Sequence, residues 1–214
     1  MKLTEKILVA LSILAIVLKL LLIPGGSVLF VLAISILSCI YFALGFALFN
    51  GIRLRKMFKK ESYSNTSALK IIGAICMGFV LSMVSIGIMF KLQMWPGAGP
   101  MLIVGAPPMF IILIIVFVKF ILTKHKFYLN ALIRCGIFTL FGIALFFTSG
   151  LTLIKLQFRN HPEYIQAYEA YQNNPSSLEL FDKMETERMR ATTNPENFAR
   201  YMEYKNEMDK ELQK

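Results

Sequence analysis

Long apolar stretches alternate with short polar ones from position 1 to position 156, and a mixed pattern follows. Five apolar stretches approach the ~20 residues that a helix needs to cross the hydrocarbon core of a bilayer. They cover about residues 7–23, 27–52, 68–94, 101–122 and 127–154. The pattern therefore predicts an all-α integral membrane protein, in which a transmembrane domain over 1–156 forms two helical hairpins and one further helix.

The remaining residues, 157–214, predict a tail of short amphipathic helices outside the bilayer. Asn160, Asn174 and Asn194 each stand shortly before a proline, and Asn and Pro favour the first positions of a helix. Apolar residues then recur at spacings typical of one apolar face per helix. The aromatic members of these faces are Tyr164, Tyr168, Tyr171, Phe181, Phe198 and Tyr201. Short helices need a surface to pack on, so these residues either pack within the tail, lie on the membrane, or dock a protein partner.

Two Pro-Gly turns separate the helices of the predicted hairpins. The segments Lys19-Leu-Leu-Leu-Ile-Pro-Gly and Lys91-Leu-Gln-Met-Trp-Pro-Gly align without gaps and agree at four of seven positions, which predicts an internal repeat. Turn-forming residues beside a tryptophan are typical of the membrane interface. We therefore expect an interfacial group that includes the lysine ending the fifth apolar stretch: Lys19, Pro24, Gly25, Lys91, Trp95, Pro96, Gly97 and Lys155.

Charge is divided unevenly between the two parts of the chain. Residues 1–156 hold 15 Lys/Arg and two acids, whereas residues 157–214 hold eight Lys/Arg and 11 acids. The basic residues concentrate in the loops at 53–60 and 124–126, and loops of this kind stay in the cytoplasm. This predicts a bacterial inner-membrane protein with a cytoplasmic N-terminus and a periplasmic tail. Because orientation explains the basicity, we expect no nucleic-acid partner; the expected partners are the lipid bilayer and either another protein or a second copy of the chain.

Charged residues within the apolar stretches are the candidates for chemistry. Lys19, Lys91 and Lys155 either extend to the headgroups or form a site for an anion. Arg134 lies deeper in the fifth stretch, where it either pairs with an acid of a partner subunit or lies near the inner interface. No carboxylate occurs between Glu5 and Glu61 or between Glu61 and Glu163. Transport coupled to protons or sodium usually relies on such groups, so we do not expect it.

Catalytic signatures are not found in this sequence. Ser, His and acidic residues form no recognisable motif, no glycine-rich phosphate loop occurs, and Cys39, Cys76 and Cys135 are expected to be packing residues. We therefore expect no enzyme activity, cofactor or metal. Two function classes remain: a scaffold or interaction subunit with a docking tail, and a transporter or channel component that binds an anionic solute through the outer lysines.

One segment resembles a known family. The run Gly87-x-x-x-Lys91-x-x-x-Trp95-Pro-Gly-Ala, followed by Met101-Leu-Ile-Val-Gly105, is similar to the membrane hairpin of the gliding-motility and type IX secretion motor subunit family. The resemblance covers about residues 87–121 and implies a hairpin whose turn faces the periplasm. This chain departs from the family in its five apolar stretches in place of two, and in Met109, which stands about where the family carries a membrane glutamate. A motor role would therefore need an acid from another chain.

Overall fold

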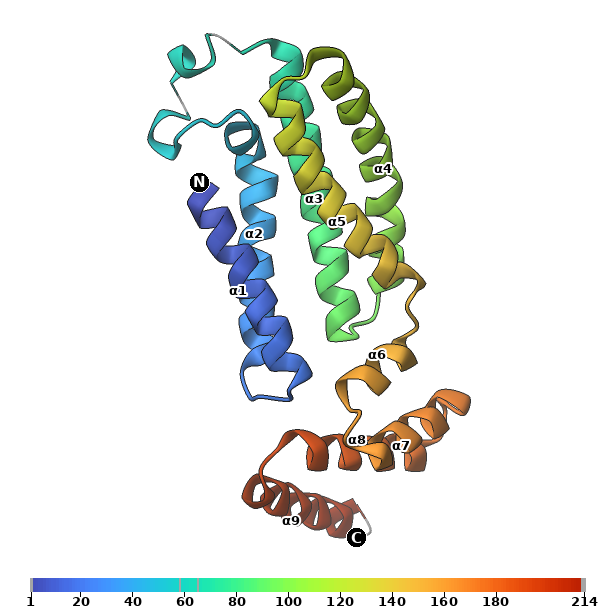
Figure 1. Ribbon diagram of the computed structural model, residues 1–214. Coiled ribbons are helices and arrows are strands. Elements are labelled where there is room, and N and C mark those ends of the chain that lie inside the picture. Colours follow the sequence, from blue (N-terminus) through green and yellow to red (C-terminus); the bar gives the residue numbers. More distant parts are fainter. Residues whose placement is uncertain (1, 58, 65, 213–214) are drawn as a thin grey trace. The chain divides into compact units, whose positions relative to one another are not determined.

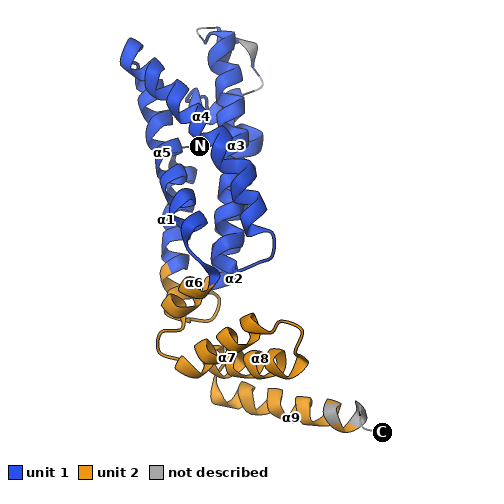
Figure 2. Cartoon of the chain, turned by 90° about the vertical axis from the view of Figure 1, so that its right-hand side faces the viewer, with its two compact units in different colours: residues 1–16, 27–150 blue, residues 17–26, 151–214 orange. Residues whose placement is uncertain are grey.

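The fold is that of a computed structural model, which describes residues 2–57, 59–64 and 66–212 (Figure 1). The described residues form nine α-helices and two short 3-10 helices, without a strand. The all-α prediction is confirmed. The chain divides into two compact units: unit 1 holds residues up to 16 together with 27–150, and unit 2 holds residues 17–26 together with those from 151 onward (Figure 2). The expected boundary between 156 and 157 differs from this division, because the first Pro-Gly turn groups with the tail.

Unit 1 is a bundle of antiparallel helices. It contains most of α1 (Lys2–Leu20) and of α2 (Gly26–Phe49), and all of α3 (Ala68–Gln93), α4 (Ala98–Thr123) and α5 (Lys126–Phe147). The α2–α3 loop and the α4–α5 loop lie at one end of this unit, and the α3–α4 turn lies at the other (Figure 1). The two basic loops therefore share one end, which we call the basic end.

Four of the described helices are long and apolar enough to cross a membrane, namely α2, α3, α4 and α5. Helix α1, the expected first span, is not among them, so the prediction of five spans is not confirmed. Its sequence gives the reason, because Lys2, Glu5, Lys6 and Lys19 leave only residues 7–18 without charge. That stretch is shorter than the ~20 apolar residues of a typical span.

The expected fifth helix, 127–154, is two helices in the structure. Helix α5 ends at Phe147, and α6 (Gly150–Gln157) begins shortly after it. Thr148 adopts an extended backbone, and its hydroxyl donates to the carbonyl oxygen of Ala144 at 2.8 Å. Ser and Thr side chains offer the backbone an alternative to helical hydrogen bonds, and a glycine follows, so the Thr-Ser-Gly sequence separates the two helices. In contrast, α4 continues through Pro107 and Pro108.

Close helix contact in unit 1 depends on small residues. A methyl group on Gly78 would collide with the carbonyl oxygen of Tyr41, and one on Gly45 would lie 2.8 Å from the α-carbon of Gly78. Beside this contact the hydroxyls of Ser38 and Ser82 are 2.7 Å apart. Small residues let membrane helices approach closely, and hydroxyl pairs link them. The α2–α3 interface is therefore specified by these four positions.

The two Pro-Gly turns have the same backbone conformation. Leu22 and Met94 are left-handed, with φ of 55° and 57°, and Gly25 and Gly97 have φ of 87° and 88°. In each turn one amide bonds to the carbonyl three residues earlier and the next amide to the carbonyl five residues earlier, which is the Schellman pattern that ends a helix. These residues occupy matching positions of the two repeated segments, so the local geometry agrees with the sequence repeat.

Unit 2 is built from α6 and three further helices: α7 (Pro162–Asn173), α8 (Leu178–Thr192) and α9 (Pro195–Leu212). Asn194 caps α9 as expected, accepting from the amide of Asn197 at 2.8 Å. Helix α8 begins later than Asn174 predicts, because Ser177 accepts from the amide of Leu180 and is the residue that caps it. The residue at the N-cap of α7 is His161, not Asn160.

Helices α8 and α9 run antiparallel. The ammonium of Lys205 lies 2.5 Å from the carboxylate of Asp182, while Arg190 lies over the ring of Phe198 at 5.3 Å. Later residues of one helix thus meet earlier residues of the other.

Candidate functional site

An ion pair inside unit 1 joins the first helix to the fifth. Nε of Arg134 lies 2.5 Å from Oε1 of Glu5, and Nη2 lies 2.7 Å from Oε2, so the guanidinium binds the carboxylate through both of its oxygens. The hydroxyl of Tyr41 donates to Oε1 at 3.1 Å. The Glu5 residue is only 6% exposed. Three helices, α1, α2 and α5, therefore meet at one carboxylate.

The surroundings of the pair are aromatic and apolar. The guanidinium carbon of Arg134 lies 5.4 Å from the centre of the Phe49 ring, and Tyr41 packs edge-on against Phe138 at 5.7 Å. Arg134 is eight residues from the start of α5, which is about 12 Å along the helix. The pair thus lies below the basic end, among residues that the apolar helices would place in hydrocarbon. Charged groups at such a depth are normally paired, and these two are.

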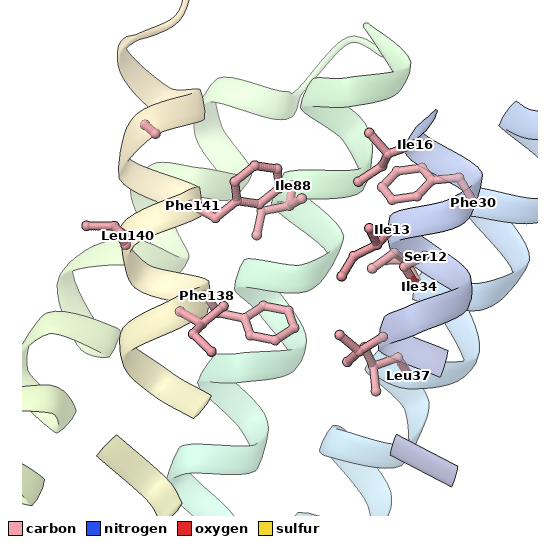
Figure 3. Close-up of a pocket in the computed structure, with 13 residues that line it drawn as sticks. Ser12, Ile13, Ile16, Phe30, Ile34, Leu37, Ile88, Phe138, Leu140 and Phe141 are labelled. Atoms are coloured by element: carbon pink, nitrogen blue, oxygen red, sulfur yellow. The ribbon is translucent and has the colours of Figure 1, made fainter. Parts of the chain in front are cut away.

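An apolar groove begins next to the ion pair. It has a volume of about 440 Å³ and lies between α1 on one side and α5 on the other, with α2 and α3 contributing to the wall (Figure 3). Ser12 is the polar residue among its lining side chains, and its hydroxyl already donates to the carbonyl of Leu8 at 2.8 Å. The lining is therefore hydrocarbon in character. The residues labelled in the figure are Ser12, Ile13, Ile16, Phe30, Ile34, Leu37, Ile88, Phe138, Leu140 and Phe141.

Two further cavities, with polar and charged residues among their lining, continue this groove toward the basic end. The nearer one, of about 420 Å³, contains Glu5, Lys6, Asn130 and Arg134. It shares Val9, Ile13, Ile137 and Phe138 with the apolar groove. The farther one, of about 260 Å³, shares Asn130 with the nearer cavity and adds Lys70 and His125. The three together form a track that is basic and polar at one end and apolar at the other.

The outer lysines do not gather at one site. Lys91 belongs to unit 1, whereas Lys19 and Lys155 belong to unit 2. Lys19 is buried, and the ammonium of Lys155 lies 2.7 Å from the carboxylate of Glu169. None of the three lines the cavities described above.

The other turn residues expected at the interface are exposed at their two separate turns. Pro24 and Gly25 are exposed in the first turn, and Trp95, Pro96 and Gly97 are exposed in the second. Trp95 also packs edge-on against Phe90 at 5.3 Å. These residues shape the turns, and the structure does not bring the two groups into one binding site.

Most tail aromatics pack within unit 2. Tyr164 is buried, with its ring centre 4.4 Å from that of Phe158 and 6.2 Å from that of Tyr168. Burial raises the pKa of Tyr164 to about 12. Tyr171 contacts Phe181 at 5.6 Å. These side chains therefore build the tail, although Phe181 keeps much of its surface exposed.

The last two candidates, Phe198 and Tyr201, lie together on α9 and are half-buried. Other apolar side chains on α8 and α9 are more open. Leu178 is 84% exposed and Met208 is 43% exposed. We call Leu178, Phe181, Tyr204 and Met208 the exposed tail cluster.

Sequence reasoning singled out Arg134 but did not find its partner. The available signal was the scarcity of acids, because Glu5 and Glu61 are the two carboxylates before residue 157. The structure also places Met109 in the core of unit 1, fully buried. Among the described residues, no three His, Cys, Asp or Glu side chains gather in a way that could hold a metal ion.

Comparison with protein families, curated proteins and solved structures finds no match for this chain. The interpretation of the site therefore depends on its geometry.

Proposed function

We propose that this chain is a non-enzymatic interaction subunit of a bacterial inner membrane, in which a helical bundle anchors a tail that docks another protein. The observation that carries the proposal is the exposed tail cluster. Single exposed apolar residues are ordinary on protein surfaces, but here four of them belong to two helices that contact each other.

The antiparallel contact of α8 and α9 brings two members of the cluster to the same end of the helix pair. Leu178 stands one turn before Asp182, and Met208 stands nearly one turn after Lys205, the residue that binds Asp182. Residues three or four apart share a face of a helix. Leu178 and Met208 therefore lie at the same end of the helix pair.

Acidic residues outnumber basic ones among the sequence neighbours of this cluster and favour one kind of partner. Glu179, Glu203 and Glu207 neighbour its members in sequence and are exposed. Anionic lipid headgroups attract basic segments and repel acidic ones, so a membrane surface is a poor match. The fitting partner is a protein with an apolar patch flanked by Lys or Arg, since complementary charge fixes orientation at an interface.

The proposal includes an orientation of the chain in the membrane. The two basic loops share one end of unit 1 (Figure 1), and basic loops of membrane proteins stay in the cytoplasm. With α1 as a fifth span, the N-terminus is cytoplasmic and the tail is periplasmic. The Glu5–Arg134 pair supports α1 in this role, because a neutralised pair costs less in hydrocarbon than two separate charges.

Affinity capture of the full chain from solubilised membranes tests the docking function. We expect the double variant Leu178→Asp with Met208→Asp to retain its partner at least ten-fold less well than the unmodified chain. The physical reason is that loss of central apolar contacts commonly costs about 1.4 kcal/mol or more, which is a factor of ten in affinity. The matched control is Gln166→Asp with Gln172→Asp, which adds the same charge at exposed positions of α7. Equal capture by both double variants would contradict the docking role of the cluster.

A further inference from the structure

We propose that the track between α1 and α5 binds one anionic phospholipid of the bilayer, with an acyl chain in the apolar groove and the headgroup among Lys6, Asn130 and Lys70. This site is separate from the tail and does not depend on the docking function.

The apolar groove fits a lipid chain in chemistry and in size. Its lining is hydrocarbon, and its volume of about 440 Å³ lies in the range of small-molecule sites, roughly 300–1,000 Å³. Along α5 the apolar groove extends from Ile137 to Ala144, seven residues or about 10 Å. That is about a third of the ~30 Å hydrocarbon core, so the groove covers part of the depth of one leaflet.

The polar end carries excess positive charge. Lys6, Arg134 and Lys70 line the two polar cavities, and Glu5 is the carboxylate among their lining residues. Because Glu5 and Arg134 neutralise each other, Lys6 and Lys70 remain to attract an anion. Asn130 lines both cavities and supplies an amide that can donate to a phosphate oxygen. Basic pockets between membrane helices are a recognised setting for anionic headgroups.

The track has an apolar part followed by a basic part, and this arrangement fits an amphiphilic molecule better than other occupants. A free phosphate would leave the apolar groove without an occupant, and a wholly apolar helix of a partner would leave Lys6 and Lys70 without an anion. A phospholipid satisfies both ends, and its chain and headgroup are separated in the same order as the groove and the polar cavities. The Glu5–Arg134 pair lies between them and holds α1 and α5 on either side of the track.

Native mass spectrometry of the full chain in detergent tests the site with two probes that share their acyl chains, phosphatidylglycerol and phosphatidylcholine. We expect the anionic lipid to bind more tightly. Replacing Lys6→Gln and Lys70→Gln should lower that preference about five-fold per lysine, the change that corresponds to about 1 kcal/mol for each basic residue near an anionic headgroup. The control pair, Lys124→Gln with Lys126→Gln, removes equal charge from the basic end outside the track and should leave the preference unchanged.

A second pair of variants tests the groove. Ile13→Trp places a large ring over it, whereas Ile111→Trp places the same ring on α4; the two isoleucines are 59% and 58% exposed. We expect Ile13→Trp to weaken binding of both lipids at least ten-fold and Ile111→Trp to change neither, with thermal melts confirming that both variants fold. Equal binding by the two variants, or no preference for the anionic lipid, would overturn the proposal. So would a dimer of the chain that Ile13→Trp dissociates, because the groove would then be an interface between copies.

Discussion

Glu5 and Arg134 are far apart in the chain and bind each other through two hydrogen bonds within apolar surroundings. A buried ion pair adds little net stability compared with apolar residues of the same size, but removing one partner leaves an uncompensated charge. The pair therefore constrains which face of α1 meets α5 more than it raises stability.

This predicts a specific pattern among variants. Glu5→Gln should lower the free energy of unfolding in mixed micelles by about 3 kcal/mol, because Arg134 is left without its counter-charge. The double variant Glu5→Gln with Arg134→Met should recover most of that loss, since no buried charge remains and the amide still accepts from Tyr41. A double variant no more stable than the single one would show that the charges do not interact in the folded protein.

At this scale the sequence was informative about residue types and uninformative about partners. Helical periodicity placed Arg134 deep in the fifth apolar stretch, but it does not say which helix lies opposite. The sequence leaves two interpretations for Arg134, pairing with an acid of a partner subunit or a position near the inner interface, whereas the structure pairs it with Glu5 of the same chain. Pairing between the first and the fifth helix is a property of the tertiary packing, which hydropathy does not encode.

Among the elements, the α2–α3 contact depends on backbone approach at Gly45 and Gly78. Neither residue needs an unusual φ, since both lie within helices; the constraint is the space that a side chain would need. A larger residue must push the two helices apart and disturb the hydroxyl pair of Ser38 and Ser82.

Gly78→Ala should therefore destabilise the protein by about 1–3 kcal/mol, the usual cost of overpacking a core. Gly73→Ala on the same helix is the control, because a methyl group there meets no atom within 4 Å. Alanine is favoured over glycine inside a helix by about 0.5–1 kcal/mol, so this variant should be as stable as the unmodified chain or slightly more so. The measurement is unfolding in mixed micelles, and equal destabilisation by both substitutions would contradict the packing described here.

Helix positions were predicted most reliably where the sequence has long apolar stretches with few charged residues. The apolar stretches that became α2, α3 and α4 were placed to within a few residues, and Asn194 was correctly placed before α9. Predictions were weaker where side chains compete with backbone hydrogen bonds. The Thr-Ser-Gly sequence at 148–150 separates α5 from α6, and Ser177 replaces the expected Asn174 at the start of α8.

For the whole molecule, composition correctly predicted an all-α chain with membrane helices, and α1 is the predicted span that is not among the four candidate spans of the described residues. Its charges at residues 2, 5, 6 and 19 set it apart from the four helices that satisfy the length and hydropathy of a span. The grouping of turn residues 17–26 with the tail was not predictable, because α2, α3, α4 and α5 separate the two segments in the chain.

Transmembrane topology is the property on which both proposals depend, since the periplasmic tail requires the basic loops to be cytoplasmic and the lipid site requires α1 to cross the bilayer. Single cysteines would be introduced as Thr4→Cys, Ser64→Cys and Ser176→Cys, in a background whose three native cysteines are replaced by alanine. A membrane-impermeant maleimide would then be applied to intact and permeabilised cells. We predict that Ser176→Cys is labelled in intact cells, and that Thr4→Cys and Ser64→Cys are labelled only after permeabilisation. Labelling of Thr4→Cys together with Ser176→Cys in intact cells would contradict the five-span topology.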